Sequence, residues 1–281
     1  MARSGKAPSR PHLRDLLDEA YDRFAHPSFI EHDPIRIPRA FSKREDAEVI
    51  GFLTATIAWG QRPTIIANAN KLVRLMDNAP YAFVMNADTA DLRHLDRFVH
   101  RTFNGIDLVH FVRGLRHVYT VHGGLENAFV LEQPPAASHA PPAVNANQLA
   151  AGGSGLAAGI SQFKQRFFAI DHDPRTRKHV ADPSKGSNAK RINMYLRWMV
   201  RPADRGVDLG LWKQLSPADL MVPLDVHTGR VARELGLLQR KHDDWKAVEE
   251  LTAALRAFDP VDPVKYDLAL FGIGVSAARK R

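Results

Sequence analysis

The stretch AEVIGFLTATIAWG, residues 47–60, carries apolar side chains all the way round a helix. A helix that is hydrophobic on every side has no face suited to solvent, so it belongs in the interior of a protein. We therefore predict that residues 47–60 form a buried central helix and that the rest of the chain packs around it.

Amphipathic helices are predicted on both sides of this segment. In each of them, large apolar residues recur every three or four positions, which places them on one helical face. These segments are residues 12–24, 64–76, 106–119, 156–168 and 245–258, and the last of them stops before Pro260 and Pro263. Since no convincing series of alternating apolar and polar residues indicates strands, we predict an all-α fold.

The composition limits the class of protein. The chain of 281 residues is long enough for one large domain or two small ones. Its formal net charge of +8 suits a polyanionic partner such as nucleic acid. The sequence holds no cysteine, which excludes disulfides, iron–sulfur clusters and cysteine-ligated zinc. It shows neither a signal-peptide core nor an apolar run of membrane-spanning length, so we expect a cytoplasmic monomer without a membrane partner.

Two segments are predicted to lie outside the packed helices. Residues 1–11 are basic and rich in turn-forming residues, which indicates a disordered tail. Residues 132–155 are rich in Pro, Ala, Gly and Asn and poor in large apolar residues. Because amphipathic helices resume directly after them, residues 132–155 are interpreted as a flexible surface insertion.

The stretch KGSNAKRINMYLRW, residues 185–198, has the pattern of a glycine turn that feeds a helix. Such a turn is a ready phosphate site, because free N–H groups point outward at the start of a helix. Lys190, Arg197 and Arg201 share one helical face, opposite an apolar face that we expect to be buried. The plainer alternative is a solvated basic face with no ligand.

The stretch VPLDVHTGRVARELGL, residues 222–237, places Asp225 just before an amphipathic helix. On spacing alone, its favoured role is that of a helix N-cap. Asp225 and His227 could also begin a metal site, but no third ligand follows at a recognisable spacing. We therefore expect no metal, and we expect His227 to support the start of the helix.

Two turns carry further polar residues. In IAWGQRPT, residues 57–64, Gln61 and Arg62 follow the buried helix, and a Gln beside an Arg suits the probing of a nucleic-acid groove. In RTFNGID, residues 101–107, Asn104 and Gly105 supply turn chemistry between two helices. In both turns, ordinary solvated loop residues are the simpler interpretation.

The order of these segments resembles the helix-hairpin-helix DNA glycosylase superfamily, of which endonuclease III is a member. VIGFLTATIAWGQRPT looks like the helix that ends in a Gln, and TFNGIDLVHFVRGL is similar to the helix pair that follows it. KGSNAKRINMYLRW looks like the hairpin, and PLDVHTGRVARELGL resembles the segment that carries the catalytic aspartate. The match covers roughly residues 45–275 without the insertion. The whole chain also resembles an uncharacterised bacterial family, a domain of unknown function, within this superfamily.

The resemblance implies a fold and a site. The fold would have two helical lobes with a DNA-binding cleft between them, residues 42–202 forming the inner lobe and residues 12–41 with 203–281 the other. Lys190 falls on the catalytic lysine, Asp225 on the catalytic aspartate, and Gln61 on the residue that fills the hole left by a flipped base. The residues implied to contact DNA are Gln61, Arg62, Asn104, Lys185, Gly186, Ser187, Asn188, Arg197 and Arg201.

Two departures from the family pattern bear on the substrate. The hairpin usually reads Gly-x-Gly, whereas this chain has Gly186, Ser187 and Asn188; Asn tolerates a positive φ, so the turn can survive. Lys190 and Asp225 lie 35 residues apart, which is closer to the archaeal 8-oxoguanine branch than to endonuclease III. The missing cysteines rule out the iron–sulfur subfamily. The resemblance therefore implies an oxidised purine, 8-oxoguanine in particular, in double-stranded DNA.

The implied reaction is base excision repair in the bacterial cytosol or nucleoid. A glycosylase extrudes its target nucleotide and holds the base in a pocket. Attack by a neutral Lys190 on the sugar would give a Schiff base and then AP-lyase cleavage, with Asp225 stabilising the positive sugar. Neither a divalent metal nor another cofactor is needed. The candidate aromatic residues for stacking on the base are Trp59, Phe103, Trp198, Trp212 and Phe271, although most helical aromatics belong to a core.

Two other classes of protein remain open. One is a non-catalytic helical nucleic-acid-binding protein that uses the basic helix and the glycine turn for phosphate contacts alone. It predicts that Lys190→Ala weakens binding and reduces its dependence on salt. The other is a metal-dependent hydrolase built around Asp225 and His227, which predicts activity lost to chelators and restored by a divalent ion.

Overall fold

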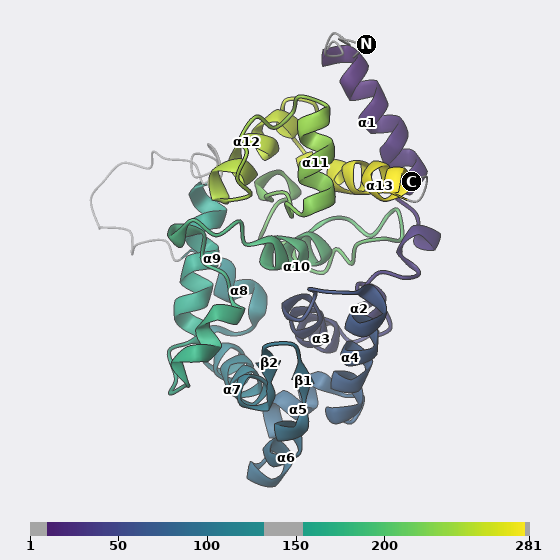
Figure 1. The fold of residues 1–281 in the computed structure, drawn as a ribbon. Coiled ribbons are helices and arrows are strands. Elements are labelled where there is room, and N and C mark those ends of the chain that lie inside the picture. Colours follow the sequence, from purple (N-terminus) through teal and green to yellow (C-terminus); the bar gives the residue numbers. More distant parts are fainter. Residues whose placement is uncertain (1–9, 132–153, 279–281) are drawn as a thin grey trace, which may run out of the picture.

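The computed structural model describes residues 10–131 and 154–278, which fold almost entirely into helices (Figure 1). The all-α prediction is confirmed. The small exception is a hairpin in which β1 (Val99–His100) pairs antiparallel with β2 (Phe103–Asn104). Short 3-10 turns join the helices: η1 (Pro27–Ile30), η2 (Leu95–Arg97), η4 (Pro174–His179), η5 (Pro183–Lys185), η6 (Pro217–Asp219) and η7 (Pro263–Lys265).

The predicted central helix is α3 (Arg44–Thr56), and every residue from Ala47 to Thr56 is buried in it. It packs against α2 (Arg36–Arg39), α4 (Arg62–Leu75), α5 (Pro80–Asn86) and α10 (Lys190–Val200). A Cβ atom at Gly51 would lie 2.8 Å from Met199, so this glycine allows the close approach of α10. The helix ends at Thr56 rather than at residue 60, which leaves residues 57–61 as a loop.

The other helices on the α3 side of the molecule are α6 (Thr89–His94), α7 (Gly105–His122), α8 (Leu125–Phe129) and α9 (Ser154–Phe167). Phe52 of α3 is at the centre of an aromatic core in which it stacks on Phe111 and meets Phe163, Phe167 and Tyr195 edge-on. The predicted insertion at 132–155 lies outside the described residues, except that residues 154 and 155 open α9.

The remaining helices gather at the opposite end of the molecule, with α10 between the two groups (Figure 1). They are α1 (Arg10–Phe24), α11 (Val226–Glu234), α12 (Trp245–Arg256) and α13 (Tyr266–Ala278). Helix α13 packs on both α1 and α11, so the first and the last described helices are neighbours. Of the predicted tail, residues 1–9 lie outside the described residues, and residues 10 and 11 begin α1. Among the described helices, none is long and apolar enough to cross a membrane.

Candidate active site

One cavity of about 810 Å³ brings together Lys190 and Asp225, which are far apart in the sequence. Its walls come from η1 and the segment before α2, the loop after α3 with the start of α4, and the turn before α10 with the first turns of that helix. The start of α11 and one face of α13 complete it, with Ala181 and Asp243. The predicted site residues that line it are Trp59, Arg62, Ser187, Asn188, Lys190, Arg197, Asp225, His227 and Phe271. The volume lies in the range of ligand pockets, about 300–1,000 Å³.

Lys190 is the first residue of α10, as the predicted glycine turn and helix require. Its backbone N–H donates to Asn188 Oδ1 at 3.2 Å. Its side chain is half-buried, and within residues 10–131 and 154–278 its ammonium group makes neither a hydrogen bond nor an ion pair. An amine that faces a cavity without a protein partner is available to a ligand.

The turn before Lys190 differs from the expected one. The positive φ angles occur at Gly186, +81°, and at Ala189, +47°, and not at Asn188. Asn188 is used differently: its Oδ1 accepts from the Lys190 N–H, and its Nδ2 donates to the Leu224 carbonyl at 3.3 Å. The asparagine therefore links the α10 turn to the segment that carries Asp225. Gly186 and Lys185 are exposed and lie outside the cavity wall.

Asp225 is the N-cap of α11, as its position before the helix predicts. Its Oδ1 accepts from the Thr228 N–H at 2.8 Å. Its other carboxylate oxygen has no hydrogen bond from the described part of the chain, and the residue is half-buried in the cavity wall. Capping therefore uses one oxygen and fixes the side chain, while the second oxygen stays available to a ligand.

Asp267, near the start of α13, is a cavity residue that the sequence interpretation missed. It is 5% exposed, its Oδ2 accepts from Arg197 Nη1 at 2.6 Å, and its Oδ1 accepts from Thr228 Oγ1 at 3.3 Å. Burial raises the pKa of Asp267 to about 6; the Arg197 charge acts against this rise, and the Asp225 charge adds to it. The available signal was that Asp267 is the one charged residue among residues 266–278.

The five candidate stacking aromatics divide into two groups. Trp59 and Phe271 line the cavity, and each lies under a guanidinium group: Arg191 Cζ is 4.7 Å from the Trp59 ring centroid, and Arg62 Cζ is 4.8 Å from that of Phe271. For the other three the base-pocket prediction is wrong, because they are fully buried core residues that do not line the cavity: Phe103, Trp198 and Trp212. The indole N–H of Trp212 donates to Glu48, which accounts for its burial.

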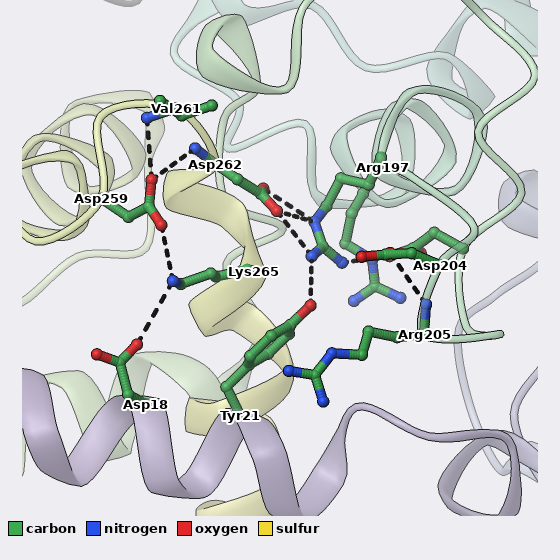
Figure 2. Close-up of polar contacts among 11 residues, drawn as sticks. Asp18, Tyr21, Arg197, Asp204, Arg205, Asp259, Val261, Asp262 and Lys265 are labelled. Atoms are coloured by element: carbon green, nitrogen blue, oxygen red, sulfur yellow. Dashed lines mark hydrogen bonds and ion pairs between the residues drawn. The ribbon is translucent and has the colours of Figure 1, made fainter.

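The predicted exposed basic face of α10 is also wrong at Arg197 and Arg201, which are 6% and 3% exposed. Arg197 pairs with Asp208 and Asp267. Arg201 pairs with Asp208 and Asp262 and donates to the Tyr21 hydroxyl, in the network of Figure 2. Because buried arginines that hold carboxylates are not open to a DNA phosphate, these two residues leave the set of candidate DNA contacts.

The remaining candidates lie at or beyond the rim. Gln61 is exposed at the start of α4. Asn104 caps α7 and accepts from Arg175 Nη1 at 2.8 Å, so its amide is already engaged. Arg101, which was not anticipated, has a φ of +56° and lies against Gly60, where a Cβ atom would come within 2.8 Å of its Nη1. An exposed arginine in a strained backbone conformation beside the cavity loop is a functional feature to test.

His227 lines the cavity, and its ring meets that of Phe271 edge-on with centroids 6.0 Å apart. It lies in the first turn of α11, and its supporting role at the helix start stays a prediction. Within the described ranges, no group of three or more His, Asp or Glu side chains could hold a metal ion.

The comparisons with known proteins give a family without an assigned activity. A family described as "Protein of unknown function (DUF2400)" matches residues 33–276. Searches of curated proteins and of solved structures found no match. The matched range includes every wall of the cavity except the part that Phe29 and Ile30 supply.

Proposed function

Because the chain belongs to the DUF2400 family, whose description assigns no activity, we propose a function from the cavity itself: a DNA base-excision glycosylase that is also an AP lyase. The observation that carries the proposal is the shared cavity of Lys190 and Asp225. A nucleophilic amine and a carboxylate are the two groups that this chemistry needs. The proposal extends to the fold: two helical lobes of the helix-hairpin-helix glycosylase type, with the DNA bound in a cleft between them.

The reaction would begin with the Lys190 amine in its neutral form. Its nitrogen forms a bond to the sugar C1′ while the C1′–N bond breaks, and the base leaves with the bonding electrons and takes up a proton. Opening of the sugar ring gives an imine to the lysine. Loss of a C2′ proton then expels the 3′ phosphate and nicks the strand. Asp225 would stabilise the positive charge that builds on the sugar as the base departs.

The surroundings of the two residues suit an extruded nucleotide. Trp59 and Phe271 line the cavity, each with an arginine guanidinium over its ring, so an aromatic residue and a cation stand together at two places in its wall. Gln61 and Arg101 lie on exposed loops at or near its rim, where a wedge could fill the vacated place in the base stack and a cation could contact phosphate. Oxidised purine is the proposed substrate class, on the long separation of Lys190 and Asp225 in the sequence.

The test is borohydride trapping on duplexes that carry 8-oxoguanine, an oxidised pyrimidine or an abasic site. The wild type is expected to give a covalent adduct and Lys190→Ala none. Lys246→Ala, at an exposed lysine of α12 outside the cavity wall, is the matched control and should trap like the wild type. Asp225→Asn keeps an equally good N-cap, so its fold should persist while base release falls by about 100-fold or more.

Each alternative gives a different result. Release of free base without an adduct would indicate a monofunctional enzyme in which Asp225 activates water. Activity that EDTA removes and a divalent ion restores would favour the hydrolase built on Asp225 and His227. If no duplex gives either adduct or free base, the proposed enzyme activity is wrong and a nucleic-acid-binding protein is the better description.

A further inference from the structure

Arg191, the half-buried second residue of α10, differs from two buried arginines further along, Arg197 of the same helix and its C-cap Arg201. Arg197 and Arg201 each pair with two carboxylates. Arg191 lines the cavity beside Lys190, and no carboxylate of the described residues pairs with it. Burial alone lowers its pKa to about 10, without an opposing acid. Shielding a cation from water without a counter-charge costs free energy of folding. That cost indicates that Arg191 has a function at the cavity wall.

The contacts of Arg191 fix its guanidinium group in one orientation. Nη1 donates to the Thr56 carbonyl at the end of α3, and the group lies over the Trp59 ring. The two nearby histidines, His100 and His179, carry pKa values lowered mainly by burial and further by the Arg191 charge, so neither adds a second cation at neutral pH. The ring contact with Trp59 fixes the plane of the guanidinium group, and the hydrogen bond to the Thr56 carbonyl fixes its rotation within that plane.

The other edge of the Arg191 guanidinium group, formed by Nε and Nη2, makes no hydrogen bond within the described chain. Arginine presents Nε–H and one Nη2–H side by side, as a pair of parallel donors. A fixed pair of donors at a cavity wall suits a planar ligand with oxygen acceptors on its edge, as in arginine recognition of guanine.

We infer that Arg191 selects the extruded base by binding exocyclic carbonyl oxygens, so that oxo bases are accepted and bases without such oxygens are not. This inference rests on the proposed glycosylase function and adds the residue that sets base preference. The substrate class is then an oxidised or deaminated base with carbonyl groups, bound with its edge toward the Nε and Nη2 atoms of Arg191. Arg191 would be distinct from the lysine and the carboxylate that act on the sugar.

An abasic duplex separates base recognition from the chemistry, because it keeps the sugar and the phosphates and lacks only the base. The experiment compares wild type, Arg191→Lys and Arg191→Gln in two assays. The first is borohydride trapping on the abasic duplex. The second is single-turnover release of 8-oxoguanine, uracil and ethenoadenine, of which ethenoadenine has no carbonyl oxygen. Arg256→Lys is the matched control, since Arg256 is also half-buried, donates to backbone carbonyls and lies away from the cavity.

Wild type should release oxo bases and not ethenoadenine. Both Arg191 variants should trap the abasic duplex within about twofold of the wild-type rate, while release of oxo bases falls about tenfold or more, the usual cost of losing a bidentate arginine contact. Arg256→Lys should match the wild type in both assays. Thermal unfolding of each variant checks that the fold is intact, and Arg191→Gln serves if Arg191→Lys does not fold.

Three outcomes would overturn the inference. If the variants lose trapping and release together, Arg191 contacts the phosphate or the sugar and does not read the base. If they match the wild type on every base, the residue has no role in selection. If the wild type traps the abasic duplex but releases no oxo base, the site is a lyase without base recognition. Failure of the wild type in both assays is a separate result: it removes the proposed function itself, and this inference with it.

Discussion

Asp267 lies in the cavity wall and accepts hydrogen bonds from buried side chains behind that wall. It binds Arg197 behind it and Thr228 beside it, and Thr228 in turn donates its N–H to Asp225. The position of Asp225, the proposed acting carboxylate, therefore depends on a second, buried acid. Asp267 is a positioning residue in this arrangement, because it reaches Asp225 through Thr228.

The raised pKa of Asp267 predicts a pH-dependent stability. Its pKa rises from about 3.9 in an unfolded chain to about 6 in the fold, so the folded state holds the proton more tightly. The resulting stabilisation is fully present below pH 4 and is lost as the pH rises through 6, a change of at most about 3 kcal/mol. Urea unfolding between pH 4 and 8 should show this fall for the wild type and not for Asp267→Asn. Parallel profiles for the two proteins would contradict the assignment.

At the scale of elements, the spacing of apolar residues predicts most of the helices and their buried faces, but it does not predict the burial of two arginines. The buried α3 and the amphipathic α11 and α12 follow from the spacing of apolar residues within each segment. The burial of Arg197 and Arg201 does not, because their partners Asp208, Asp262 and Asp267 come from later segments. In the sequence, a basic helical face that is buried against acids has the same pattern as a basic face exposed to solvent.

In the candidate site, too, local features could be predicted from the sequence and contacts between distant segments could not. The turn, the N-cap and the positions of Lys190 and Asp225 were accessible from local pattern and resemblance. The unpaired Arg191 and the buried Asp267 were not, because their meaning depends on which residues of other elements surround them.

The contact between α13 and α1 gives a prediction at this scale. A Cβ atom at Gly272 would lie 2.2 Å from the Phe24 ring, whereas the nearest atom to one at Gly274, on the same helix, is 3.2 Å away. Gly272→Ala should therefore force the two helices apart and cost about 1–3 kcal/mol. Gly274→Ala should change stability by less than about 1 kcal/mol, because the gain in helix propensity offsets a mild contact. Urea midpoints measure both, and equal effects would contradict the packing.

At the scale of the whole molecule, a buried ionic network joins parts of the chain that are remote in sequence (Figure 2). Arg201, the C-cap of α10, binds Asp262 before η7, Asp208 in the loop that follows α10, and Tyr21 of α1. Its pKa is raised by these acidic partners against the effect of burial. The network ties α1 and the α12–α13 connection to the helix that carries Lys190.

Breaking this network should destabilise the entire fold. Arg201→Met leaves Asp262 without a cation and takes from the buried Asp208 one of its two arginines, for which we expect a loss of about 3–5 kcal/mol in the free energy of unfolding. Arg205→Ala removes an exposed pair with Asp22 from the same region and should cost less than about 1 kcal/mol. Thermal and urea unfolding of the two variants, measured together, provide the check. A loss for Arg201→Met no greater than that for Arg205→Ala would show that the network adds nothing.

The cavity wall is built from segments that are remote in the sequence, and this has a consequence for when the cavity forms during synthesis. Lys190 and Asp225 emerge from the ribosome well before α13, yet α13 supplies Asp267, Leu268 and Phe271 to the same enclosure. The enclosure is thus complete only when the last described helix has docked against α1 and α11. A nascent chain already holds the amine and the carboxylate before α13 completes the cavity wall, so the proposed nucleotide site forms late, when α13 has docked.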